Sequence, residues 1–134
     1  PFWPTSTMEF AAPMNQIPKA VFSKQGPAIL KAATVTEGLP SAESWAQAAG
    51  PFRHTVSSAG WQSAIRAIRE PLGPLRARRL KWATYTETLP GAAPGQYVVL
   101  EYETRFDNRV SAAETVIPMK TQDGSWKVSA YAIR

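Results

Sequence analysis

The chain has 134 residues, 44% of them hydrophobic and 19% charged, with a formal net charge of +5 at pH 7. This length is typical of one domain and suffices to bury a core without covalent cross-links. Because cysteine is absent and histidine occurs once, the sequence excludes disulfides, cysteine-ligated zinc, iron–sulfur clusters, thiol catalysis and histidine-rich metal sites, and we expect no cofactor.

Residues 1–26 are predicted to form an extended arm. Its prolines interrupt any helix, because proline lacks the amide proton and restricts the residue before it. Aromatic side chains are nevertheless frequent there, whereas a disordered tail normally lacks them. We therefore expect the arm to dock on a neighbouring copy of the chain through Phe2, Trp3 and Phe10. The alternative is that Trp3 packs back on its own domain.

Residues 27–134 are predicted to form a single α+β domain that begins with helices. Pro27 suits a first helical turn, and Ser41 and either Ser57 or Ser58 suit N-caps, because a serine hydroxyl can accept an amide hydrogen bond there. Glycine and proline residues end these helical segments. Helices are expected over residues 28–37, 41–49 and 60–70.

From residue 75 onward the apolar residues recur at every second position, which is typical of strands. Strands are expected over residues 75–89, 97–107, 109–121 and 125–133, and Asp123-Gly124 indicates a tight hairpin turn. Three residue sets are each predicted to share one face of their strand: Leu80, Trp82 and Thr84; Val98, Leu100 and Tyr102; and Trp126, Val128 and Ala130, opposite Tyr131. Helices followed by a four-strand meander predict N-terminal helices packed on a curved antiparallel sheet.

A spaced series of residues extends from the second predicted helix to the C-terminus. It includes Ser44-Trp45, Trp61, Leu72-Gly73, Gly95-Gln96-Tyr97 and Asp123-Gly124-Ser125-Trp126. Over residues 41–134 this series resembles the bacterial family catalogued as domain of unknown function 4019. The resemblance implies a small exported domain with a cystatin-like or nuclear-transport-factor-2-like cone shape, and it implies no established activity. The chain begins with Pro1 instead of methionine, which fits removal of an export signal, so we expect a periplasmic or extracellular protein.

Glutamates on neighbouring predicted strands raise the question of acid–base chemistry. A carboxylate beside tyrosines in an apolar cavity would form a small ligand-binding pocket, with isomerase-like chemistry as its less favoured form. That pocket would be lined by Trp82, Tyr85, Tyr102, Tyr131, Glu101 and Glu114. The favoured interpretation is simpler: Glu101, Glu103 and Glu114 pair with Arg78, Arg105 or Arg109 across strands. Arg69 and Arg79 are expected to pair with Glu114 or to cap backbone carbonyl oxygens.

Positive charge is concentrated in residues 53–81, where seven basic residues stand against Glu70 alone. A surface formed by Arg66, Arg69, Arg76 and Lys81 would bind an anionic polymer weakly, and nucleic acid is the less favoured partner, since basic patches are common on protein surfaces. His54 is expected on the surface near a helix end, without a metal.

No nucleophile elbow, phosphate loop or dinucleotide fingerprint occurs in the sequence. No apolar run approaches the ~18 residues of a membrane helix. We therefore expect a non-catalytic exported domain that forms a homo-oligomer, with an open head-to-tail array as one possible form, or that binds another partner. The apolar ligand pocket and the anionic-polymer surface are the alternatives.

Overall fold

The computed structural model describes residues 19–39 and 41–134. The predicted docking residues Phe2, Trp3 and Phe10 lie outside the described residues, so their placement stays a prediction.

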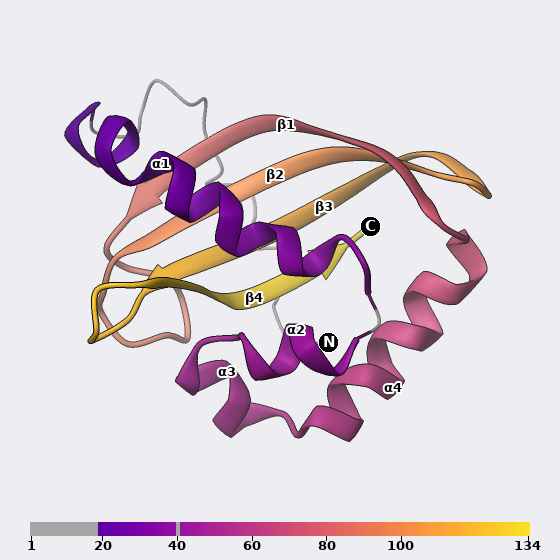
Figure 1. Ribbon diagram of the computed structural model, residues 1–134, viewed down its shortest axis with the longest axis horizontal. Helices are drawn as coiled ribbons and strands as arrows, with labels where there is room; N and C mark the ends of the chain where they lie inside the picture. Colours follow the sequence, from indigo (N-terminus) through magenta and orange to yellow (C-terminus); the bar gives the residue numbers. More distant parts are fainter. Residues whose placement is uncertain (1–18, 40) are drawn as a thin grey trace.

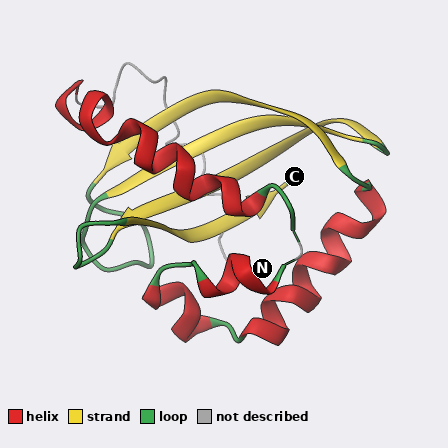
Figure 2. Cartoon of the chain, in the orientation of Figure 1, coloured by secondary structure: helices red, strands yellow, loops and turns green. Residues whose placement is uncertain are grey.

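Helices gather on one face of a curved four-stranded antiparallel sheet (Figure 1). The sheet has the order β1-β2-β3-β4, a simple meander, and the helices precede all four strands in the chain. Figure 2 shows the helices, in red, beside the yellow strands of the sheet. The helical elements are α1 (Lys19–Ala33), α2 (Ala42–Ala46), α3 (Gly50–Thr55) and α4 (Ser58–Arg69), with 3-10 turns η3 (Thr34–Thr36) and η4 (Glu70–Leu72). The strands are β1 (Leu75–Thr86), β2 (Tyr97–Phe106), β3 (Arg109–Lys120) and β4 (Trp126–Ile133). This architecture confirms the predicted α+β fold.

Helix α1 begins at Lys19, nine residues before the predicted start at residue 28, and Pro27 lies inside it. The prediction was wrong because an internal proline removes only its own amide hydrogen bond, while the turns on either side keep theirs. Apolar burial and a hydrogen bond hold α1 on the sheet: Ile29 and Ala33 are buried in the core, and the indole Nε1 of Trp126 donates to Gln25 Oε1 at 2.8 Å. Residues 19–26 are therefore helical, and not extended as predicted.

The segment predicted as one helix over residues 41–49 forms α2 and is followed at Gly50 by the separate helix α3. Pro51 occupies the first turn of α3, where its missing amide proton costs nothing, so the proline that suggested a break is a helix start. Both predicted serine caps are confirmed: Ser41 accepts from the amide of Ser44, and Ser57 accepts from the amide of Gly60, each at 3.0 Å.

The two faces of the sheet are distinguished by what covers them. The inner face packs against the helices, and it carries Val98, Leu100 and Tyr102 as predicted for β2. The outer face carries a smaller apolar cluster that includes Val99 and Ile117. The main core comprises Ile29, Ala33, Leu39, Ala48, Phe52, Trp61, Ile65, Ala83, Val98, Leu100, Tyr102, Val116, Trp126, Val128 and Tyr131.

A bulge in β1 overturns the predicted alternation of that strand. Leu80 pairs with Tyr102, but Trp82 pairs with Glu101, so one extra residue, Lys81, separates the two pairs. Leu80 consequently packs on the inner core, whereas Trp82 lies on the outer face beside Thr84.

A second irregularity changes the phase of β4. Ile117 pairs with Ala130 and Pro118 with Val128, which leaves Ser129 unpaired between them. Val128 and Tyr131 therefore both enter the inner core, although the simple alternation predicted opposite faces for them. Along the edge of β4 that does not pair with β3, the Ala49 amide donates to the Val128 carbonyl oxygen at 2.8 Å.

Candidate functional site

Four elements bring ionisable side chains together under the sheet, in what we call the buried charge cluster: Arg69, Arg78, Glu114 and Tyr131. Glu114 of β3 is fully buried, and Arg78 Nη2 of β1 lies 2.8 Å from its Oε1 atom. Arg69, at the end of α4, places Nη1 3.6 Å from Oε2 of the same carboxylate. The hydroxyls of Tyr131 and Thr104 also donate to Glu114.

The two guanidinium groups of the buried charge cluster also hold the chain that follows α1. Arg69 donates to the carbonyl oxygens of Thr36 and Glu37 at 3.0 and 2.9 Å, and Arg78 donates to the Thr36 hydroxyl at 2.9 Å. Each guanidinium also lies over an aromatic ring, Arg69 over Phe106 at 4.9 Å and Arg78 over Tyr102 at 4.7 Å. Arg69 Nε, in contrast, is buried without a partner among the described residues.

This arrangement suits structure better than proton transfer. Burial, together with the charge of Glu114, raises the pKa of Tyr131 far above its usual range, so its phenol remains a protonated donor. Glu114 is saturated by two arginines and two hydroxyls. The prediction that Glu114 pairs with Arg78 and Arg69 is confirmed.

The remaining glutamates also pair, but with other partners than predicted. Glu103 pairs with Arg79 at the surface, and the Glu101 carboxylate lies 3.2 Å from Arg134 Nη2.

The six residues predicted to line one ligand pocket lie on both faces of the sheet. Tyr85, Tyr102, Tyr131 and Glu114 belong to the inner side, where the tyrosines pack against the core. Trp82 and Glu101 lie on the outer face, because consecutive residues of a strand point to opposite sides and the bulge at Lys81 changes the phase of β1. The structure therefore does not bring the six together around one cavity.

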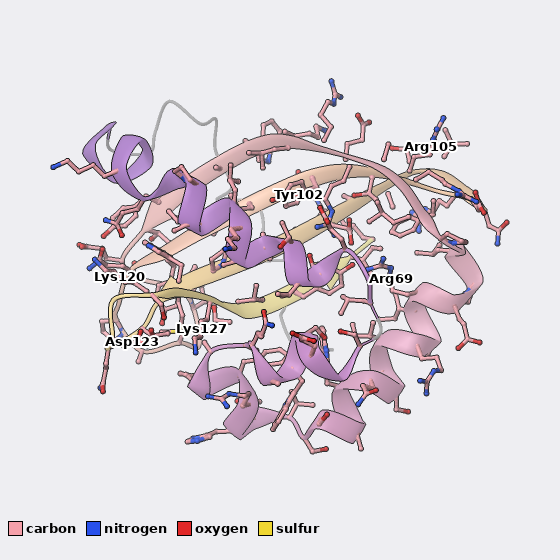
Figure 3. All side chains as sticks on the ribbon, viewed as in Figure 1. Arg69, Tyr102, Arg105, Lys120, Asp123 and Lys127 are labelled. Atoms are coloured by element: carbon pink, nitrogen blue, oxygen red, sulfur yellow. The ribbon has the colours of Figure 1, made fainter. Side chains whose placement is uncertain are left out.

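The predicted basic surface is dispersed as well. Arg69 is 4% exposed and belongs to the buried charge cluster. Figure 3 shows it on the side of the molecule opposite Lys120 and Lys127. The other members have local partners: Arg66 lies 3.5 Å from Glu70, Arg76 pairs with Asp107, and the Lys81 ammonium lies 5.2 Å from the Trp82 ring centre.

An open apolar cleft of about 450 Å³ lies between α3, the loop of residues 87–96 and the end of the sheet. It is lined by Pro51, Phe52, Thr55, Val56, Leu89, Pro90, Gly91, Ala92, Ala93, Pro94, Tyr97, Met119 and Ser129. None of these side chains carries a charge. The sequence indicated only a loop over residues 90–95, and its contact with α3 could not be inferred because α3 was itself not predicted.

The three hydroxyl groups of the apolar cleft are already engaged as donors. Tyr97 donates to the Ala93 carbonyl oxygen at 2.6 Å, Thr55 to Pro51 at 2.8 Å, and Ser129 to Ile117 at 2.8 Å. Burial raises the pKa of Tyr97, which keeps its phenol neutral. The apolar cleft therefore offers shape and apolar contact to a ligand, and no ionised group for catalysis.

Metal and membrane sites are not found in the part of the chain that the structure describes. Within residues 19–39 and 41–134, no three side chains of histidine, cysteine, aspartate or glutamate gather to hold a metal ion. His54 is exposed in the last turn of α3, as predicted. Over the same residues, no helix combines the length and apolar character needed to span a bilayer.

The meander sheet, its helical cover and the buried charge cluster define a small α+β domain. The chain belongs to the family DUF4019, described as a protein of unknown function, whose model matches residues 30–131. This match confirms the resemblance and extends it into α1. No curated protein and no solved structure matches the chain.

Proposed function

We propose that this domain is a non-catalytic module of an exported bacterial protein, and that it assembles with copies of itself through its N-terminal arm. The arm of this proposal is residues 1–18, which precede α1 in the chain. The arm of one copy docks on an apolar surface of the next, with Phe2, Trp3 and Phe10 as the anchors.

The observation that carries this proposal is the contrast in charge between the arm and the domain. Residues 1–18 contain only Glu9 of the 25 charged residues in the chain (15 basic and 10 acidic). Transfer of such an aromatic, nearly uncharged segment from water to an apolar partner surface lowers the free energy of the system. Among the described residues, no three histidine, cysteine, aspartate or glutamate side chains gather to hold a metal ion.

The two alternatives have weaker support. A pocket of Trp82, Tyr102 and Glu101 would need side chains from both faces of the sheet. An anionic-polymer surface would need Arg69, which is buried, and Arg76, which is paired with Asp107.

The mass of the full chain in solution tests the proposal. Light scattering over a range of concentrations is expected to show a homo-oligomer for the wild type. Trp3→Ala should weaken association about 30-fold, equivalent to ~2 kcal/mol, as removal of a buried aromatic anchor does. Val110→Ala is the matched control, because it removes an apolar side chain that is 81% exposed on the domain itself. A monomeric wild type, or a Trp3→Ala oligomer of unchanged stability, would refute the proposal.

A further inference from the structure

We propose that the apolar cleft between α3 and the loop of residues 87–96 is the receptor for the arm of a neighbouring copy, with Phe2-Trp3-Pro4 as the segment that enters it. This inference rests on the proposed function, because it assigns the surface on which the arm acts.

The first argument is that neither the apolar cleft nor the first residues of the arm carry charge. No side chain that lines the apolar cleft is ionised, although a quarter of a typical domain is charged and this chain carries 25 charged residues (15 basic and 10 acidic). Residues 1–8 of the arm likewise contain no charged side chain. Docking therefore desolvates no charge on either partner, and such desolvation is the main cost that penalises mismatched interfaces.

The second argument is the rigidity and shape of the apolar cleft. The cleft is walled by prolines and by the rings of Phe52 and Tyr97, which lose little conformational freedom on binding. Proline-rich extended segments dock in aromatic-lined grooves because their backbone is already ordered. The volume of the apolar cleft, about 450 Å³, falls within the range of ~300–1,000 Å³ that is typical of ligand pockets.

A second cleft, of about 500 Å³, is less suited to the arm. It lies between α1 and the β3–β4 turn, and Lys31 and Lys127 are among its lining residues. An uncharged segment placed there would remove water from two ammonium groups and would offer no carboxylate in return. The lysines therefore favour the apolar cleft as the receptor.

Reach does not limit the contact, because 18 extended residues span up to ~60 Å. The arm and the apolar cleft are different surfaces of one molecule, so the contact is heterologous: each copy donates an arm to one neighbour and receives an arm from another. Two variants, one defective in the arm and one in the cleft, should then complement each other when they are mixed.

The cleft variant is Ala92→Glu, made in the full chain. Ala92 lies on the exposed loop at the rim of the cleft, so the substitution introduces a charge without removing a core contact. Its matched control is Ala67→Glu, on the exposed side of α4 away from the cleft. Sedimentation velocity is expected to show at least tenfold weaker association for Ala92→Glu, and unchanged association for Ala67→Glu.

Mixing Ala92→Glu with Trp3→Ala should yield a 1:1 complex, in which the intact arm of the first chain occupies the intact cleft of the second. If Trp3→Ala abolishes assembly but Ala92→Glu does not, or if the mixture stays monomeric, the cleft assignment is wrong while the proposed function stands. If Trp3→Ala assembles like the wild type, the proposed function itself fails.

Discussion

Replacing Glu114 by glutamine is expected to lower the free energy of unfolding by about 3–5 kcal/mol, the usual cost of removing one partner from a buried ion pair. The carboxylate is 0% exposed, and the side chains of Arg69 and Arg78 are only 4% and 5% exposed. Glutamine keeps the shape and can still accept hydrogen bonds. The loss therefore arises from two buried cations whose counter-charge has been removed.

This magnitude is large for one domain, whose total stability is typically ~5–15 kcal/mol. For a chain of this length it corresponds to a fall in melting temperature of roughly 10–20 °C. Glu103→Gln is the matched control, because Glu103 pairs with Arg79 at the surface, where both side chains are in contact with water. We expect this control to melt close to the wild type, since exposed ion pairs contribute little.

Urea unfolding at pH 7, followed by circular dichroism and by tryptophan fluorescence, would measure both variants. Coincident transitions by the two probes would establish that the free energies are comparable. A loss below about 1 kcal/mol for Glu114→Gln, or equal losses for the two variants, would refute the view that the buried charge cluster stabilises the fold.

Other substitutions test the backbone at two glycines and a proline, and the buried phenol of Tyr131. Gly73→Ala should cost ~1–3 kcal/mol in urea unfolding, because φ is 76° and a Cβ would lie 3.1 Å from Asp107 Cβ; Gly124→Ala, with a φ of 86° but open space, should cost less. Pro27→Ala should raise the melting temperature by restoring a helical hydrogen bond. Burial raises the pKa of Tyr131 in the folded state, so the unfolded chain loses this proton first. Stability should therefore hold below pH ~10 and fall above it, and an equally steep fall in Tyr131→Phe would contradict this assignment.

Local signals were sufficient where the structure depends on local contacts. The serine caps at Ser41 and Ser57 were predictable because each hydroxyl bonds an amide three residues further on. The alternation of β2 was predictable because the bulge opposite it inserts its extra residue, Lys81, into β1, so Val98 through Tyr102 keep the simple alternation of a strand. The order of the strands followed because no helix separates one predicted strand from the next, and consecutive strands usually pair.

Features that depend on a partner strand or a distant segment could not be predicted. The bulge at Lys81 has no signature in composition, because it is defined by which residues of β2 face Leu80 and Trp82. The pairing of Arg69 with Glu114 was considered from the sequence, but the burial of this ion pair was not. The burial depends on how α4 meets three strands. The apolar cleft depends likewise on the approach of α3 to a loop some forty residues later.

Strand β1 is an edge of the meander sheet, and that position bears on how the protein remains in solution. An edge strand presents unpaired backbone groups that can template fibre growth through another chain. Here the edge carries the exposed cations Arg76, Arg79 and Lys81, and its pairing shifts twice, between Leu75 and Ala77 and between Leu80 and Trp82. Two copies approaching through this edge would meet irregular backbones and bring their Lys81 cations together, while Arg76 and Arg79 are already paired with Asp107 and Glu103. Even at high local concentration, β1 is thereby a poor template for a strand of another molecule.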